Sequence, residues 1–268
     1  ATIGQPAILL ESRPRLGGRA GSFHDSGTDE WIDHCQHVGM GCCTSLMWLI
    51  QTVGLQESFR RDTTLHFVAP PHPDHPPTIH PLRASCLPAP FHLLPGLSGL
   101  KYLGSRSRRE IRRGLLALAR TTDHTLDHPF DRWLAHHGQS PESIGGFWEV
   151  ILVSALPESL DRISVAHARH VFVTGFLAHR RGWEPVIPRV PLEQIYGQRL
   201  SRWLTERGIE VRTGTGASSV EIQGEQVTGV QLRDGTSITA DQVILAVPHH
   251  RVANLLPESV THHPQIAA

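Results

Sequence analysis

The residues with the clearest chemistry lie close to the start of the chain. An apolar run, residues 7–10, ends in Glu11, which is the pattern of a buried parallel strand followed by an acid. A carboxylate at the carboxyl end of such a strand can accept hydrogen bonds from the hydroxyls of a ribose. An ordinary strand followed by a basic turn is the alternative, because an acid after an apolar strand is common.

The turn after this run carries residue types suited to a ligand that contains phosphate. Gly17 and Gly18 lack a Cβ, so the backbone there can approach a bound group closely. Arg19 follows directly and supplies a fixed cation for a pyrophosphate or for the edge of a flavin. The whole string of residues is therefore much more specific than the acid alone.

This string resembles a known motif. Read as Glu-x-Arg-x-x-x-Gly-Gly-Arg-x-x-Ser-Phe, residues 11–23 resemble the second FAD-binding motif of the amine oxidase, protoporphyrinogen oxidase and phytoene desaturase superfamily. The resemblance implies FAD as the cofactor, with Glu11 on the adenosine ribose and both Arg13 and Arg19 near the pyrophosphate. The cofactor-binding residues that it implies in this stretch are Glu11, Arg13, Gly17, Gly18, Arg19 and Ser22.

A second stretch, residues 31–44, resembles the part of the superfamily that runs beside the flavin ring. Its residues 36–37 and 41–43 are similar to those of a narrower group, the squalene-associated FAD-dependent desaturases, also called hydroxysqualene dehydroxylases. His37 is the candidate catalytic residue, beside the flavin or the substrate, and a structural histidine is the alternative. The cofactor contacts that the resemblance implies here are Gly39, Met40 and Gly41.

Two later regions resemble the same narrower group. They are residues 147–156, a Phe-Trp helix that ends in Ser-Ala-Leu, and the Pro-Arg-Val-Pro-Leu sequence at 188–192. From the residues alone, four positions of this helix belong to a core, which is compatible with the wall of a substrate tunnel. These positions are Trp148, Ile151, Leu152 and Ala155.

The last third of the chain changes to a strand pattern. Alternating apolar and polar residues predict strands at 209–213, 217–222, 227–233 and 237–240, and residues 242–248 predict a final buried strand. In the superfamily such a meander lies against the FAD, so the resemblance implies that an amide near Ala217 reaches the adenine. Any small antiparallel sheet is the alternative.

Helical spacing and capping residues place helices between these motifs. Thr44 is expected to cap a helix that stops at Gly54, and Ser107 is expected to open a helix to about residue 120 through a capping box. Further helices are expected at 127–138, at 140–156, after Ser164 and from Pro191 to Gly208. Residues 69–90, rich in Pro and His, are expected to form an irregular loop.

The expected fold is α/β, with an incomplete Rossmann-like FAD-binding domain, a mostly helical substrate domain and an antiparallel β-meander. Residues 1–54 and 190–250 are expected to form the discontinuous FAD-binding domain, 55–189 the substrate domain, and 251–268 the start of a further segment. The first residue is Ala, and residues 1–6 cannot hold the Gly-rich phosphate-binding turn of the superfamily. We therefore expect a fragment that lacks both ends.

Composition limits the classes of function. The chain has 25 basic and 25 acidic residues, so nothing in its charge favours a nucleic-acid partner. No apolar stretch of about 18 residues is present, so no membrane span is expected. The four cysteines fit neither a disulfide framework nor a zinc pattern, which favours a reducing cytoplasm, and Cys42 and Cys43 are interpreted as small buried residues. No metal site is expected, because His72, His75 and His80 lie in a Pro-rich loop.

The resemblance implies an FAD-dependent oxidoreductase that acts on an apolar C30 isoprenoid. Its reaction would be the reductive dehydroxylation of hydroxysqualene to squalene in hopanoid biosynthesis. A carotenoid-type desaturase or a flavin amine oxidase is the enzymatic alternative, although the chain has only two tyrosines for the aromatic cage that an amine would need. A truncated, non-catalytic binding module is the alternative of another class.

A substrate of this kind is almost insoluble in water, so it is expected to arrive from a bilayer. The apolar, Pro-interrupted stretch 87–97 is followed directly by the arginine-rich helix start at 106–113. Apolar insertion beside a basic patch is the two-signal arrangement of peripheral membrane binding. Residues 87–113 are therefore expected to contact the inner face of a membrane, and a buried loop beside a solvated helix is the alternative.

Overall fold

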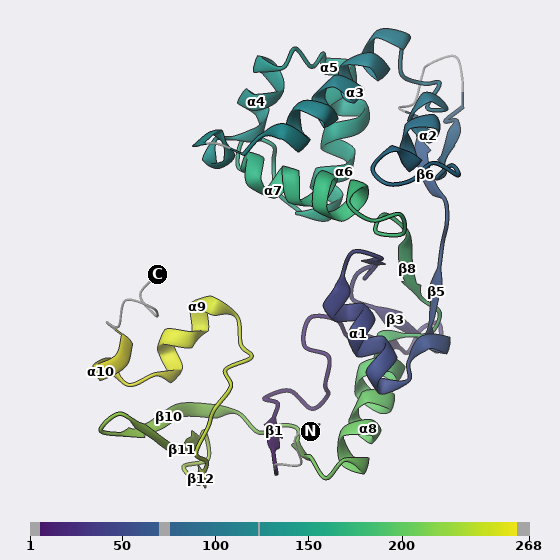
Figure 1. Cartoon of the computed structure of the whole chain (residues 1–268). Coiled ribbons are helices and arrows are strands. Elements are labelled where there is room, and N and C mark those ends of the chain that lie inside the picture. Colours follow the sequence, from purple (N-terminus) through teal and green to yellow (C-terminus); the bar gives the residue numbers. More distant parts are fainter. Residues whose placement is uncertain (1–5, 70–75, 123, 262–268) are drawn as a thin grey trace. The chain divides into compact units, whose positions relative to one another are not determined.

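The computed structural model describes residues 6–69, 76–122 and 124–261 (Figure 1). The chain divides into two compact units, Ala1–Gln36 with Val190–Ala268, and His37–Arg189. Residues 37–54 were expected with the FAD-binding domain, yet they lie in the second unit, where their strand β4 pairs with β8. The described part of 251–268 lies in the first unit. The assignment of cofactor and substrate to these units stays a prediction.

The first unit contains a parallel pair of strands that are far apart in the sequence. The strand β1 (Ile8–Leu10) pairs with β9 (Glu210–Arg212), with Ile8 opposite Glu210. A hairpin follows, in which β2 (Ser22–Asp25) pairs antiparallel with β3 (Glu30–Asp33). The strands predicted at the start of the chain and at 209–213 are confirmed.

The predicted helix from Pro191 to Gly208 is confirmed in extent and is π-helical in its first half. It consists of η6 (Glu193–Leu200) and α8 (Ser201–Glu206), and Gly208 follows with a left-handed φ of 74°. Asp33 and Ser22 cap its start: the Leu192 N–H donates to Asp33 Oδ1 at 3.0 Å, and the Glu193 N–H donates to Ser22 Oγ at 2.9 Å. The Ser22 hydroxyl in turn donates to Asp33 Oδ1 at 2.6 Å.

The predicted meander is also confirmed. The strands β10 (Ala217–Gln223), β11 (Gln226–Leu232) and β12 (Ser237–Thr239) form an antiparallel sheet in that order. Its buried side chains are those of Val220, Val230 and Leu232, so one face is apolar as the alternation indicated. The chain then forms three short turns of helix, α9 (His249–Val252), η7 (Ala253–Leu255) and α10 (Glu258–Thr261).

The predicted final strand at 242–248 is wrong for this structure. These residues have extended or bent backbone without strand pairing, and the Ile244 side chain is 92% exposed. A strand needs a neighbour that accepts and donates its backbone hydrogen bonds. Within the described residues, the parallel sheet contains only β1 and β9, so the apolar run at 242–248 has no strand beside it.

The second unit contains a small sheet next to a helix. The sheet has the order β4 (Gly39–Met40), β8 (Pro185–Pro188), β5 (Phe59–Arg61). The helix α1 (Thr44–Val53) ends at Gly54 as predicted, with φ 77°, and η1 (Gln56–Ser58) follows. The predicted cap is wrong, because Cys43 is the N-cap residue and no side chain caps this helix.

The region 69–90 is more regular than expected. β6 (Leu65–Val68) pairs antiparallel with β7 (Ile79–Leu82), so residues 79–82 are a strand and not part of an irregular loop. The hairpin forms because Phe67 and Leu82 are buried in the core of the unit. A short turn, η2 (Phe91–Leu93), and the helix α2 (Leu94–Ser98) lead on from it.

Helices form the rest of the second unit (Figure 1). They surround an aromatic core in which Trp148, Phe130 and Phe172 are almost completely buried. The indole N–H of Trp148 donates to Gln139 Oε1 at 2.8 Å, so its one polar group is satisfied inside the core. The helices are α3 (Ser105–Arg120), η3 (His124–Asp127), α4 (Phe130–His136), α5 (Pro141–Ser143), η4 (Ile144–Trp148), α6 (Glu149–Ala155), α7 (Val165–Arg169) and η5 (His170–Leu177).

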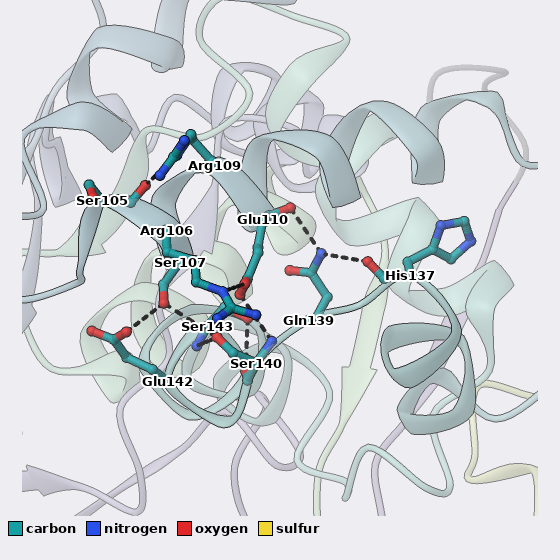
Figure 2. A network of polar contacts seen from close by, with 10 residues as sticks. All are labelled: Ser105, Arg106, Ser107, Arg109, Glu110, His137, Gln139, Ser140, Glu142 and Ser143. Carbon is teal, nitrogen blue, oxygen red and sulfur yellow. Dashed lines mark hydrogen bonds and ion pairs between the residues drawn. The ribbon is translucent and has the colours of Figure 1, made fainter.

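A polar network ties the starts of α3 and α5 together (Figure 2). Each helix lends a carboxylate to the other: Glu142 accepts from the Gly104 N–H at 2.7 Å, and Glu110 accepts from the Ser140 N–H at 3.1 Å. The hydrogen bond from Ser107, followed by that from the Gly104 N–H, holds the pKa of Glu142 below its usual range. Hydrogen bonds from Ser140 and then from Arg106 do the same for the pKa of Glu110. The predicted capping box is wrong, because α3 begins at Ser105 and the Ser107 hydroxyl donates to Glu142 instead of capping.

We predict that Ser22→Ala lowers the free energy of unfolding by about 1–2 kcal/mol, because it removes a buried helix cap and leaves the Glu193 N–H without its acceptor. Urea unfolding followed by circular dichroism measures the change. Ser26→Ala is the matched control, since Ser26 is exposed in the neighbouring loop, and it should change stability by less than about 0.5 kcal/mol. Equal effects of the two substitutions would contradict the capping role.

Candidate functional site

The acid predicted to bind a ribose lies at the carboxyl end of β1. The Glu11 side chain is half-buried, and its Oε1 accepts from the Arg13 N–H at 2.8 Å and from the Ser12 hydroxyl at 3.4 Å. The backbone of Glu11 continues the pairing with the β9 side, because its N–H donates to the Arg212 carbonyl at 2.9 Å. The carboxylate is thus held at the strand end, and the hydrogen bonds it accepts from described residues fall on Oε1.

Two glycines in the following turn are required for different reasons. Gly17 has φ 107°, and a Cβ there would lie 2.7 Å from the Ala20 carbonyl oxygen, so packing alone demands glycine. Gly18 has φ 56°, and no atom lies within 4 Å of where its Cβ would be. The left-handed φ therefore accounts for the glycine at position 18, and the described residues leave the space beside it unfilled.

The arginines of the turn also differ. Arg13 closes the turn, because its Nη1 donates to the Gly18 carbonyl at 3.0 Å. Arg15 lies 5.5 Å above the centre of the Trp31 ring and 3.9 Å from Glu193, so it has partners within the unit. Arg19 is exposed and makes no hydrogen bond or ion pair with the described residues. Among the three, Arg19 has the guanidinium that is available to an anion.

Ser22 and Ala217 complete the predicted cofactor residues of the first unit. Ser22 is buried, and its hydroxyl is used by the helix cap described above. Ala217 opens β10 opposite Leu232, and the register shifts between Ala217 and Ser219. The Ser218 hydroxyl donates to the carbonyls of Gln231 and Leu232, which fixes this irregular strand start. Their contact with a cofactor stays a prediction.

The predicted flavin strip lies in the second unit, where close packing explains its glycines. A Cβ on Gly41 would lie 2.0 Å from the Arg181 carbonyl oxygen, and one on Gly39 would lie 2.5 Å from the Leu46 side chain. Met40 lies between them in β4, opposite Pro185. On the neighbouring strand β5, Arg61 donates to the buried carboxylate of Glu184 at 3.0 Å.

His37 and the cysteines flank this strip. His37 is half-buried at the beginning of the second unit. Cys42 is also half-buried, and burial raises the pKa of its thiol, with the neighbouring Cys43 adding to the effect. Cys43 is exposed, so its predicted burial is wrong. It is the N-cap residue of α1, and the buried residue of that helix is Ile50, near the other end. Cys35 is exposed.

The structure thus brings the predicted residues together in two groups. One group lies in the first unit, in the turn after β1 and at the start of β10, and it comprises Glu11, Arg13, Gly17, Gly18, Arg19, Ser22 and Ala217. The other group lies in the second unit and comprises His37, Gly39, Met40 and Gly41. The geometry inside each group is defined by the bonds given above.

The second unit also contains a cavity with an entirely apolar lining. Its volume is ≈ 20 Å³, close to that of one water-sized sphere, and eleven side chains line it. Of the helix positions predicted to form a tunnel wall, Ile151 lines it, Trp148 and Leu152 are core residues, and Ala155 is exposed. The lining residues are Leu65, Phe67, Leu82, Leu93, Leu97, Leu115, Phe147, Ile151, Phe172, Phe176 and Leu177.

One titratable residue beside this cavity was missed by the sequence analysis. His92 is completely buried, and neither ring nitrogen has a hydrogen-bond partner within the described residues. Burial lowers the pKa of His92, and the Arg180 guanidinium lowers it further. It precedes Leu93, which lines the cavity. No sequence signal distinguishes it, because a His in a Pro-rich stretch reads as a loop residue.

The described residues contain no group of three or more His, Cys, Asp or Glu side chains that could hold a metal ion. His80 packs against Tyr102 with ring centres 5.0 Å apart and the ring planes tilted by 49°, and His72 and His75 lie outside the described residues. In the part of the chain that the structure describes, every helix is too short or too polar to span a bilayer.

Comparison with known proteins identifies the family. The model of the flavin containing amine oxidoreductases matches residues 2–268, so the chain belongs to this family. FAD is accordingly its cofactor. The residues present fit such a group, since the carboxylate at the end of β1, the open space at Gly18 and the free guanidinium of Arg19 lie in one turn. No curated protein sequence matches the chain.

Solved structures show the same fold. An oxidoreductase from Methanosarcina mazei has a TM-score of 0.71 and 18% identity, with 99% of this chain and 59% of that one covered. The PF1083 protein from Pyrococcus furiosus has a TM-score of 0.64 and 16% identity, with 100% and 60% covered. Putrescine oxidase bound to putrescine has a TM-score of 0.60 and 16% identity, with 92% and 54% covered. The predicted α/β fold class is confirmed, and the chain spans about three fifths of the length of these proteins.

We predict that Glu11→Ala in the full-length protein weakens FAD binding by about 1–3 kcal/mol, or roughly five- to 150-fold in Kd, because two ribose hydroxyls lose their acceptor. Titration with FAD, followed by quenching of flavin fluorescence, measures the change. Glu11→Gln is the matched control: it keeps an acceptor oxygen for the Arg13 N–H and should be milder. An unchanged Kd in the Ala variant would contradict the assignment of Glu11 to the ribose.

We predict that stability falls as the pH drops below 6.5 and that His92 contributes to this fall. Because burial lowers the His92 pKa below 6.5, the unfolded chain takes up this proton first as the pH decreases, and the folded state loses stability relative to it. The free energy of unfolding measured at pH 7.5 and 5.5 should decrease less in His92→Phe than in the wild type. An identical decrease in both proteins would show that His92 is not responsible.

Proposed function

We propose that the whole protein is an FAD-dependent oxidoreductase that acts on a large apolar substrate, a C30 isoprenoid such as hydroxysqualene. The observation that supports an apolar substrate is the cavity of the second unit, whose eleven lining side chains carry no polar group. A polar or cationic substrate would lose its hydration there without a compensating partner. The resemblance of residues 31–44 and 147–156 to the squalene-associated group supports the C30 length.

The proposed reaction is a reductive dehydroxylation. Bound FAD, once reduced to FADH2, would supply a hydride and a proton. The allylic C–O bond of hydroxysqualene breaks, the hydride forms a C–H bond at the same carbon, and a proton joins the departing hydroxyl to give water, so the products are squalene, water and oxidised flavin. The protein holds the cofactor through Glu11 and Arg19, and His37 is the candidate group beside the flavin or the substrate.

The apolar wall also has to exclude water from the reacting carbon, because a cationic allylic centre reacts with water. The described cavity holds about one water-sized sphere, so a C30 chain requires its Leu and Phe side chains to move apart. Such movement separates only apolar contacts, and the substrate replaces them with similar ones. The substrate would then be surrounded by apolar side chains, which leave no polar group to hold water beside it.

The main rival is oxidation of an amine, since putrescine oxidase has a similar fold. An amine site needs groups that receive a cation, namely a carboxylate or an aromatic cage. The described cavity has phenylalanines but no carboxylate and no tyrosine among its lining residues. A carotenoid-type desaturase would share the apolar wall and differ in taking hydrogen from the substrate rather than supplying it. A non-catalytic binding module would hold no flavin.

We predict that the full-length protein, loaded with FAD and reduced anaerobically, converts hydroxysqualene to squalene with one product formed per flavin reoxidised. Gas chromatography with mass spectrometry measures the product, and flavin absorbance measures the reoxidation. Putrescine and phytoene, tested with oxidised flavin, are the matched controls and should leave the flavin oxidised. Flavin reduction by putrescine would favour the amine oxidase, and reduction by phytoene would favour the desaturase. Failure to retain flavin would favour the binding module.

A further inference from the structure

A seventeen-residue segment without charge runs along the outside of the apolar cavity. Residues 84–100 contain no Asp, Glu, Lys or Arg, and Arg83 and Lys101 stand directly at its two ends. On its inner side, Leu93 and Leu97 line the cavity and Leu100 is completely buried. The segment is therefore one wall of the cavity.

The outer side of the segment exposes large apolar side chains. The Ser85 N–H donates to the His92 carbonyl at 2.7 Å, which closes residues 85–92 into a loop, and the Phe91 N–H donates to the Pro88 carbonyl at 2.8 Å, which forms the turn at its tip. Leu87 and Phe91 flank this turn and are 41% and 53% exposed. The described part of the unit therefore covers only about half of each of these two side chains.

This loop is held in place. Arg180 donates three hydrogen bonds to the loop backbone, to the carbonyls of Leu87 at 2.8 Å and of Cys86 and Ser85 at 3.0 Å. Through these three bonds Arg180 fixes the loop near the end of η5, where Phe176 and Leu177 line the cavity. The loop therefore presents Leu87 and Phe91 in a defined position.

The sequence that contains the loop is mainly basic. Residues 76–109 contain five basic side chains and no acidic one. Arg83, Lys101 and Arg109 are exposed. Arg106 is exposed but paired with Glu110 at 2.8 Å, and Arg108 is half-buried and donates to the Leu100 carbonyl at 3.2 Å. Apolar side chains exposed on a loop match a bilayer with anionic headgroups when the same stretch of chain holds cations that form no ion pair with the described residues, here Arg83, Lys101 and Arg109. The surface of a soluble protein partner usually carries both acidic and basic side chains, whereas an anionic bilayer presents a net negative charge to these cations.

We infer that the loop 85–92 is a membrane contact: Leu87 and Phe91 enter the interface of an anionic bilayer, and the exposed cations of 83–109 bind its headgroups. The vesicle binding does not depend on the proposed reaction, although an apolar substrate would reach the cavity behind Leu93 by this route. The exposure of each side chain decides which substitutions test the contact. Leu93 is buried and Arg108 is bonded, so the exposed side chains are the ones to replace.

Vesicle co-sedimentation of the purified chain tests the inference, with phosphatidylcholine vesicles and with an equal mixture of phosphatidylcholine and phosphatidylglycerol. The wild type should bind the anionic vesicles preferentially. The double substitution Leu87→Ser with Phe91→Ser should lower the partition coefficient at least about tenfold, because half-exposed side chains lose their transfer into the interface. Lys101→Glu with Arg109→Glu should lower it at least about tenfold and only on anionic vesicles.

Matched variants control for non-specific effects. Val150→Ser with Val153→Ser removes two valines of α6 that are 46% and 41% exposed, and Arg132→Glu with Arg202→Glu reverses two exposed cations outside the segment. Both controls should bind like the wild type, and thermal unfolding should show all variants folded. The inference fails if the wild type ignores anionic vesicles, which would point to a protein contact instead, or if the loop variants bind as the controls do. Conversion of detergent-dispersed hydroxysqualene separates this failure from failure of the proposed function.

Discussion

The first unit depends on one hydrogen-bonded pair, Ser22 and Asp33. Together they accept the N–H groups of Leu192 and Glu193, residues that lie 159 and 171 positions further along the chain from their acceptors. The chain can make these bonds only after the intervening segment has brought its own ends together, which β8 does by pairing with both β4 and β5. Closing a loop of this length costs several kcal/mol of chain entropy. The parallel pairing of β1 with β9 needs the same loop to close, so this loss of entropy occurs once for both sets of contacts.

The second unit has a different constraint, which is room for the Trp148 indole. A Cβ on Gly114 would lie 2.7 Å from the Trp148 ring and 3.0 Å from the Gln139 amide nitrogen that bonds to α3. The helix α3 therefore carries a glycine at its centre despite the loss of helix propensity, because close approach to the indole is worth more than the propensity. Phe130, Phe147 and Phe172 contact the same ring, and the apolar cavity begins where this aromatic packing ends.

Sequence patterns predicted the elements whose signals are local. Gly54 and Gly208 ended helices as expected, and the alternation through Val220 and Val230 gave the meander, because left-handed caps and period-two burial depend on few neighbours. Predictions failed where a distant partner decides. The run at 242–248 has the composition of a buried strand but no neighbouring strand, and Ser107 has the sequence of a cap but serves Glu142, 35 residues away. The burial of His92 follows from tertiary packing, and the Pro-rich composition around it gave no sign of this.

The motif residues themselves divide into those that build the turn and those left free by it. Gly17, Gly39 and Gly41 would be glycines for packing reasons even without a ligand, and Arg13 and Ser22 are used by backbone groups of the protein. Gly18 is required by its left-handed φ and accepts from Arg13, whereas Arg19 and the second oxygen of Glu11 make no hydrogen bond with the described residues. A substitution at Gly17 would therefore disturb the turn itself, whereas one at Arg19 would break no hydrogen bond within the described residues. Resemblance to a motif does not separate these two kinds of residue, and the space and hydrogen bonds around each of them do.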